Sequence, residues 1–458
     1  MSWTIDSWRA KTARQQPEYP DPIALQRSID RLHTLPPLVT SWEIEHLRSL
    51  LSAAAEGRGF LLQGGDCSEQ IDECSTESIV RQLKILMQMG LVMEYVGRRP
   101  VVRLGRIAGQ YAKPRSDALE TRDGVSLPVY RGDIINRSGF SLNDRQADPE
   151  LLIRGYERAA LTLNFIRALA SHGFADVHHP ENWDLAFAQD SPYRDKYQEI
   201  VASITHALQF VEMVLDRPLM DHRGVELFTS HEGLHLVYEQ AQTRRVPRRD
   251  GWYNLSTHFP WIGNRTRQLD GAHIEYFRGI QNPLGIKIDG TIDDGELERL
   301  LQALNPHNQA GRITLIHRMG VDRLCEHLPR LIEVVRRGAW KVLWCCDPMH
   351  GNTYTTPAGQ KTRDCSKILG ELKAAFEIHR AHGSRLGGVH LELTGENVTE
   401  CLGGSRGVRE EDLAKNYKST VDPRLNYDQA MEIAFLIAEQ MALDTNPPPG
   451  HQVGGVGR

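Results

Sequence analysis

The sequence contains no apolar stretch approaching the ~20 consecutive residues that a transmembrane helix needs. It also lacks a disulfide framework, because its seven cysteines are an odd number scattered over 458 residues. Positive charge is not in excess, since 54 lysines and arginines face 59 aspartates and glutamates, for a net charge of −5; this argues against a dedicated nucleic-acid-binding protein. The opening residues lack the apolar core of a signal peptide. We therefore expect a reduced, cytoplasmic protein that is not bound to membranes.

The sequence does contain a series of short apolar runs separated by helical patterns. The runs favour buried strands, and the patterns at 330–337, 368–380 and 431–443 favour helices. Alternation of strands and helices predicts a parallel sheet, and eight such units predict a closed (β/α)8 barrel, the TIM-barrel fold. The predicted strands are 59–63, 100–104, 225–229, 257–262, 284–288, 313–317, 341–346 and 388–393.

Three additions to the barrel are predicted, with residues 1–443 forming a single domain. Residues 1–58 are an N-terminal extension, whose first twenty or so residues resemble a loose end, and a helical insertion at about 148–222 separates the second strand from the third. A helix over 197–216 in this insertion has one apolar face, which packs on the barrel or on a partner subunit; it consists of Ile200, Ile204, Leu208, Val211 and Leu215. Residues 444–458, rich in proline and glycine, are expected to form a disordered tail.

Cationic side chains recur where the predicted strands end, at the rim on which the active sites of parallel barrels lie. Clustering several cations is unfavourable unless anions bind among them, and arginine forks match phosphate and carboxylate groups. The pattern predicts a phosphorylated substrate that also carries a carboxylate; the alternative is a rim of solvated charges paired with local acids. Lys287 could instead form a Schiff base, but the surrounding arginines favour an anion-binding role. The cations are Arg106, Lys113, Arg115, Arg265, Lys287 and Arg318.

A second group of side chains could bind a metal ion. Cys67, His350 and Glu392 follow or end the first, seventh and eighth predicted strands, which are neighbours in a closed barrel, and Asp422 could provide a fourth ligand. One thiolate, one imidazole and two carboxylates differ from a closed structural zinc site. They suit a catalytic ion such as Mn²⁺, Co²⁺, Fe²⁺ or Zn²⁺. Each residue also has a structural alternative, as a buried or turn-forming side chain.

The adjacent Cys345 and Cys346 are not expected to join this group. Neighbouring residues of a strand point to opposite faces, so we expect one thiol to face the barrel interior and the other to face the helices, both as packing residues. Asp347 is expected to support a ligand or to contact substrate.

Several longer motifs resemble the class II 3-deoxy-D-arabino-heptulosonate 7-phosphate (DAHP) synthases, in the order in which that family has them. The resemblance runs from about residue 15 to residue 443 and implies a (β/α)8 barrel. It also implies the first step of the shikimate pathway, in which phosphoenolpyruvate condenses with erythrose 4-phosphate and phosphate is released. The motifs are QGGDC (63–67), GRIAGQYAKPRS (105–116), TSHE (229–232), WIGNRTRQLDGAH (261–273), DPMHGNT (347–353), GENVTECLGG (395–404) and DPRLN (422–426).

The resemblance implies a role for each matching position. The implied metal ligands are Cys67, His350, Glu392 and Asp422, with Mn²⁺ as the first expectation. The implied phosphoenolpyruvate anchors are Arg106, Arg265, Lys287 and Arg318. Lys113, Arg115, Ser116 and Lys361 match the erythrose 4-phosphate site. Lys287, Arg318 and Glu232 are candidate catalytic residues, with Glu232 positioning or deprotonating water.

One position departs from the family pattern, which reads Gly-Glu-Arg-Thr-Arg where this chain has Asn264 in Gly-Asn-Arg-Thr-Arg. The amide keeps hydrogen-bonding capacity but loses the charge. This leaves open an enzyme of secondary metabolism that accepts an amino analogue of erythrose 4-phosphate; a non-catalytic regulatory relative is a further alternative. The helical insertion resembles the one that larger family members use for tetramer contacts and feedback regulation. It implies a homotetramer, an aromatic amino-acid effector and a possible chorismate mutase partner.

Overall fold

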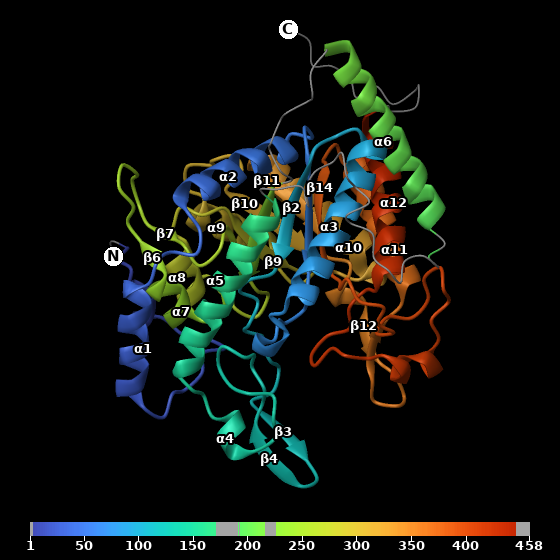
Figure 1. Cartoon of the computed structure of the whole chain (residues 1–458). Helices are drawn as coiled ribbons and strands as arrows, with labels where there is room; N and C mark the ends of the chain where they lie inside the picture. Colours follow the sequence, from blue (N-terminus) through green and yellow to red (C-terminus); the bar gives the residue numbers. More distant parts are fainter. Residues whose placement is uncertain (1–2, 171–190, 192, 216–225, 446–458) are drawn as a thin grey trace.

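The barrel is closed by eight parallel strands in the order β1-β14-β11-β10-β9-β8-β5-β2. The structure is a computed structural model that describes residues 3–170, 191, 193–215 and 226–445 (Figure 1). The predicted (β/α)8 fold is confirmed, as is the adjacency of the first, seventh and eighth strands, because β14 pairs with both β1 and β11. The strands are β1 (Phe60–Gly65), β2 (Val101–Arg106), β5 (Leu227–Glu232), β8 (Phe259–Ile262), β9 (Leu284–Ile288), β10 (Ile313–His317), β11 (Val342–Cys346) and β14 (Leu386–Glu392).

Alternation along the strands divides the core into two layers. Leu61, Phe259, Ile316 and Cys345 fill the barrel interior together with residues of α2 (Ser41–Ala55). The opposite faces of the strands pack against the surrounding helices in a larger cluster, which includes Cys346. The two adjacent cysteines therefore face opposite layers, as predicted.

The helices around the barrel bury apolar stripes against its outer face. They are α3 (Thr76–Gly97), α7 (Leu236–Ala241), α8 (Ala272–Phe277), α9 (Asp294–Leu304), α10 (Val321–Arg337), α11 (Cys365–Ala381) and α12 (Tyr427–Thr445). Several start at a side-chain cap: the Asp293 carboxylate accepts from the backbone of Glu296 at α9, and Asp364 accepts from Ser366 at α11. Among the described residues, none of the helices has the length and apolar character required to cross a bilayer.

The N-terminal extension is more ordered than its composition suggested. A short 3-10 helix (Ser7–Ala10) contacts α8 and buries Trp8, and the Trp3 indole donates to the backbone carbonyl of Glu275. The expectation of a loose end over the first twenty residues is therefore wrong for residues 3–20. Two tryptophans with apolar partners on the barrel outweigh the local polarity. Helix α1 (Pro22–Thr34) then packs on α5 and α7.

The insertion between β2 and β5 holds two long helices, α5 (Glu150–Ala170) and α6 (Arg194–Leu215). Helix α5 lies along α1, whereas α6 extends past α12 at the edge of the molecule (Figure 1). Tyr197 and Ile200 of α6 are buried against the barrel cluster. Parts of three predicted segments lie outside the described residues. They are residues 171–190, 192 and 216–222 of the insertion, residue 225 at the start of the third predicted strand, and residues 446–458 of the predicted tail.

Some predicted boundaries were wrong. The third strand extends to Glu232 instead of 229, so His231 and Glu232 belong to the strand, and α12 continues to Thr445, so residues 444 and 445 are helical rather than part of a tail. Sequence patterns also missed an antiparallel hairpin, β3 (Leu119–Arg122) with β4 (Val125–Pro128), and the small pair β12 (Thr353–Thr355) with β13 (Lys361–Arg363). Both lie at the end of the barrel toward which β2 points (Figure 1).

Candidate active site

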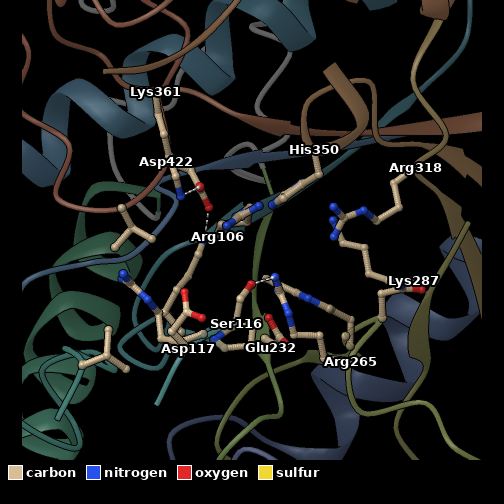
Figure 2. A pocket seen from close by; sticks show the side chains of 18 of the residues that line it. Arg106, Ser116, Asp117, Glu232, Arg265, Lys287, Arg318, His350, Lys361 and Asp422 are labelled. Atoms are coloured by element: carbon tan, nitrogen blue, oxygen red, sulfur yellow. Dashed lines mark hydrogen bonds and ion pairs between the residues drawn. The ribbon is translucent and has the colours of Figure 1, made fainter. Parts of the chain in front are cut away.

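A cavity of about 420 Å³ opens at the carboxyl ends of the barrel strands. It brings together most of the residues that the sequence singled out, and Figure 2 shows their side chains converging from both sides of the rim. The predicted residues that line it are Arg106, Lys113, Arg115, Ser116, Glu232, Arg265, Lys287, Arg318, His350, Lys361 and Asp422. Cys67 and Glu392 are buried below it, next to the same side chains.

The four predicted phosphoenolpyruvate anchors come from four different strands or the loops after them. Arg106 ends β2 and Lys287 lies in β9, both buried, while Arg318 follows β10. Arg265 follows β8, the neighbour of β9, and its guanidinium donates to the Ser116 hydroxyl at 2.8 Å. The arrangement offers several cationic donors to one anionic ligand.

Lys287 is a buried cation of the cavity whose pKa is lowered by this environment. Burial lowers the pKa of its ammonium group to about 8, against the opposing attraction of the Asp347 carboxylate with which it forms an ion pair. Asp347 also accepts from His350 Nδ1 at 2.8 Å. It thus connects a predicted anion anchor to a candidate metal ligand, and this contact suits the first of the two roles predicted for it.

His350, Glu392 and Asp422 offer ligand atoms that all lie within 4.8 Å of one another. His350 Nε2 lies 3.2 Å from Glu392 Oε1, and the Lys113 ammonium bridges the two carboxylates at 3.3 Å from Glu392 and 3.0 Å from Asp422. An imidazole with two carboxylates suits a divalent ion, and the two negative charges already attract a cation here. These three residues fit the metal that the sequence predicted.

Cys67 lies beside this cluster but its thiol is not within it. The sulfur lies 3.3 Å from the Ser419 hydroxyl and packs against Val421, the residue before Asp422. Burial raises the pKa of the thiol to about 11, and the negative charges of Glu392 and Asp422 contribute. A bound cation would oppose this shift, because a metal stabilises the thiolate.

Neighbouring cations keep the two carboxylates charged. Burial alone would raise the pKa of Glu392, but the charges of His350, Lys113, Arg363 and Arg106 hold it well below its usual range. Asp422 behaves in the same way, with Lys113 as the main opposing charge to burial. Both carboxylates are therefore ionised and able to bind a cation at neutral pH.

Glu232 is a partly buried acid that lies apart from the metal cluster. Burial raises the pKa of its carboxyl group, and Oε1 has no hydrogen-bond partner among the described residues. Gly263 makes room for it, because a Cβ there would lie 2.0 Å from that oxygen. The acid is placed to hold a proton or a water molecule.

Sequence reasoning missed three buried residues that position the site. Arg363 donates to Glu392 Oε2 at 2.7 Å, both side chains being fully buried. His390 accepts from Arg106 at 2.7 Å, and its other ring nitrogen contacts the Gln63 amide oxygen at 2.7 Å. His390 and Glu392 alternate along β14 and so share the inward face, which is the pattern that could have revealed His390.

Gln15 of the N-terminal extension holds the loop that carries Arg115 and Ser116. Its side-chain amide donates to the carbonyl of Arg115 and accepts from the backbone amide of the same residue, both at 3.0 Å. Its amide oxygen also accepts from Arg131 at 3.2 Å. Gln15 has a backbone φ of 62°, in the left-handed region that few side chains adopt.

Gln15→Ala is therefore expected to raise the KM for the substrate bound by the Arg115 loop by roughly 30-fold, because the two hydrogen bonds between Gln15 and the Arg115 backbone, ~1 kcal/mol each, are lost. The turnover number should change little. Steady-state kinetics with each substrate varied in turn would check this, with Gln16→Ala as a control because Gln16 binds the backbone of Leu234 and Leu236 instead. An equal rise in both KM values would contradict a specific role.

Comparison with known proteins places this chain in a family. The model of the class-II DAHP synthetase family matches residues 3–438. The chain belongs to this family. It is 47% identical over 453 residues to a phospho-2-dehydro-3-deoxyheptonate aldolase of Neurospora crassa, covering 95% of this chain and 94% of that protein. A protein of the same name from Streptomyces coelicolor is 46% identical, covering 95% and 96%.

Two further proteins are similar to this chain. The phospho-2-dehydro-3-deoxyheptonate aldolase AroG of Mycolicibacterium smegmatis is 42% identical over 444 residues, covering 95% of this chain and 94% of that one. Among solved structures, an enzyme of that name from Francisella tularensis aligns with a TM-score of 0.48 and 14% identity, covering 93% and 98%.

Asn264, which departs from the class II pattern, lines the cavity and has well-defined partners. Its amide donates to Asp289 at 2.6 Å and its oxygen accepts from Arg267 at 3.0 Å. A glutamate here would face the Asp289 carboxylate but could pair with Arg267. The amide is thus part of a small polar network at the edge of the site.

We expect Asn264→Glu not to reduce turnover, because Arg267, which also pairs with Asp289 and Glu296, lies next to residue 264 and would offset part of the new charge. The check is the turnover number at saturating substrates, with Asn264→Gln as the matched amide control. A large loss in the glutamate variant alone would show that the site has adapted around the amide and its contact with Asp289.

Proposed function

We propose that this protein is a metal-dependent DAHP synthase, which condenses phosphoenolpyruvate with erythrose 4-phosphate and releases phosphate, the first step of the shikimate pathway. The observation that carries the proposal is the convergence, in one cavity, of anion-binding cations with the His350, Glu392 and Asp422 cluster. The family and the names of its relatives support the same reaction.

The metal would be held by His350, Glu392, Asp422 and Cys67, with Mn²⁺ proposed first and Co²⁺, Fe²⁺ or Zn²⁺ as alternatives. A bound divalent ion would supply Lewis acidity for the aldehyde oxygen of erythrose 4-phosphate. The cations Arg106, Arg363 and Lys113 hold the two carboxylates in place through ion pairs. This fixed arrangement would preserve the ligand geometry as substrates come and go.

The cations of the cavity would hold and orient the two substrates. Arg106, Arg265, Lys287 and Arg318 would bind the carboxylate and phosphate of phosphoenolpyruvate, so that its enol carbon can attack the aldehyde carbon. Lys113, Arg115, Ser116 and Lys361 would bind erythrose 4-phosphate in the same cavity. The two groups meet where Arg265 donates to the Ser116 hydroxyl (Figure 2), so the two substrates would bind next to each other.

Glu232 would position or deprotonate the water that adds to the cationic carbon before phosphate leaves. Because the pKa of the Glu232 carboxyl group is raised, the carboxylate can take up a proton, and the unpaired Oε1 can accept it. Lys287 and Arg318 would stabilise the negative charge of the departing phosphate.

The test is an assay of phosphate release from both substrates with added Mn²⁺, together with detection of the seven-carbon product. Metal-dependent release is expected. No activity at full metal occupancy would instead support a non-catalytic regulatory relative. The same assay with the amino analogue of erythrose 4-phosphate tests the second candidate, which Asn264 leaves open; turnover only of the analogue would replace the first proposal.

We also propose that α5 and α6 form contacts in a homotetramer and contribute to a site for an aromatic amino-acid effector, with a chorismate mutase as a possible partner. Helix α6 extends from the barrel (Figure 1), and Leu161 of α5 is a large apolar side chain exposed to solvent. Light scattering of the purified protein, with and without each aromatic amino acid, tests the assembly; a monomer under all conditions would refute it.

A further inference from the structure

A second group of metal-ligating side chains lies outside the cavity, between the barrel wall and helix α11. His317 ends β10 and Cys346 ends β11, and these two residues are direct partners in the pairing of the two strands. Their side chains therefore leave the sheet on the same face. Glu371 of α11 meets them there, and all three residues are fully buried.

We propose that His317, Cys346 and Glu371 form a second, buried site for a divalent transition metal such as Zn²⁺. One ligand atom of each residue lies within 4.8 Å of the others. Imidazole, thiolate and carboxylate are all ligands of Zn²⁺ and Co²⁺. The inference does not rest on the proposed reaction.

The unusual feature of this group is the state of His317. Neither of its ring nitrogens has a hydrogen-bond partner within the described part of the chain, although the residue is fully buried. A buried polar group left without a partner costs about 1–3 kcal/mol. A metal bound through one nitrogen would remove part of that cost.

Charge balance supports the same assignment. A thiolate and a carboxylate carry two negative charges, which a divalent ion neutralises in a region without exposed solvent. Without a cation, burial raises the pKa of Glu371 to about 8 and the pKa of Cys346 well above its usual value, so both hold their protons at neutral pH. Binding would release those two protons to solvent.

Groups next to the site would orient its ligands. Glu371 accepts from the Gly320 backbone at 3.1 Å and from the Asn352 side chain at 2.6 Å, which fixes its carboxylate and leaves other lone pairs for a metal. His379 of α11, also buried, has its ring 6.0 Å from the His317 ring, and its Nε2 lacks a partner among the described residues. It is a candidate for a fourth ligand.

The position gives the site a role in shaping the cavity. His317 directly precedes Arg318, and Cys346 directly precedes Asp347, which pairs with Lys287 and His350. Glu371 contacts the loops that follow both strands. A metal here would link the two loops on the side away from the cavity. On the side that faces the cavity, the same loops carry a proposed anion anchor and a proposed ligand of the catalytic metal.

The test measures metal content after expression in medium supplemented with Co²⁺. The double variant Cys67→Ser/His350→Ala removes two candidate ligands of the catalytic site, so that remaining cobalt reports the second site. We expect two cobalt ions per chain in the unaltered protein and one in the double variant, with a thiolate-to-cobalt absorption band in both. A folded double variant without cobalt, or one whose cobalt has only oxygen ligands by X-ray absorption, would overturn the proposal.

A matched pair of cysteine variants locates the remaining ion. Adding Cys346→Ser to the double variant should abolish the absorption band, whereas adding Cys345→Ser should preserve it, because Cys345 faces the barrel interior. Loss of the band in both variants, or in neither, would contradict the assignment. If the Cys346 variant does not fold, X-ray absorption of the double variant decides, with one sulfur neighbour expected at the cobalt.

Discussion

Replacing His350 or Cys67 with alanine is expected to abolish metal-dependent turnover while the barrel remains folded. A Lewis-acid metal contributes several kcal/mol to transition-state stabilisation, and each ~1.4 kcal/mol is tenfold in rate, so we expect a loss on the order of 10³-fold or more. His350 lies at the rim with its ring between Asp347 and Glu392. Turnover measured over a range of Mn²⁺ concentrations, with bound metal determined in parallel, checks the effect.

The matched control for His350 is His382→Ala, since His382 is an exposed residue at the end of α11, away from the cavity. Circular dichroism should show the same fold in all variants. Retained activity in either the Cys67 or the His350 variant would refute the ligand assignment for that residue. This outcome matters most for Cys67, because its thiol lies outside the 4.8 Å cluster formed by the other three proposed ligands.

Lys287→Met is expected to reduce kcat/KM for phosphoenolpyruvate by roughly 10²- to 10³-fold, the effect of removing one preorganised charged donor from a buried site. The side chain is buried, so no solvent-exposed cation replaces it. The variant also leaves Asp347 without its ammonium partner. The control is Lys341→Met, which changes an exposed lysine directly before β11 and should behave as the unaltered protein.

The same lysine predicts a pH dependence with a definite sign. Below its lowered pKa of about 8 the Lys287 side chain is a cation and binds an anion; as pH rises through that value the charge is lost, and kcat/KM should fall. The Lys287→Met variant should lack this alkaline decline. The measurement of kcat/KM should run from pH 7 to 9, roughly one unit on either side of that pKa. A flat profile in the unaltered protein would contradict the role of the charged form.

The sequence was informative about the site because a parallel barrel places every strand end on one rim. Arg106, Lys287 and Glu392 could be assigned to a common surface from their positions at strand ends alone, since the topology fixes where those ends meet. The cysteine pair could be assigned to opposite layers because alternation along a strand is local. The resemblance of the longer motifs to the class II family then implied a role for each of these positions.

Other features depended on contacts between distant segments. Gln15 lies in a polar segment whose contact with the Arg115 loop has no local signature, and Arg363 becomes a partner of Glu392 only when β13 folds over the rim. The first twenty residues appeared loose because composition reflects local preference, whereas Trp3 and Trp8 find their partners on α8 and in α7. Only a folded chain brings such residues together.

By itself, the sequence determined the barrel, the rim and the ionisable side chains that the rim carries, because these follow from apolar periodicity and from residues that directly follow strands. The tertiary structure decided which of those charges pair and how far burial moves their pKa values. It also decided which buried side chains come together between the barrel and the surrounding helices. His317 and Cys346 show the difference: the sequence predicts His317 only as a strand residue and Cys346 only as a packing residue, and strand register together with helix α11 makes them neighbours of Glu371. Register and packing arise from long-range contacts, which local patterns do not specify.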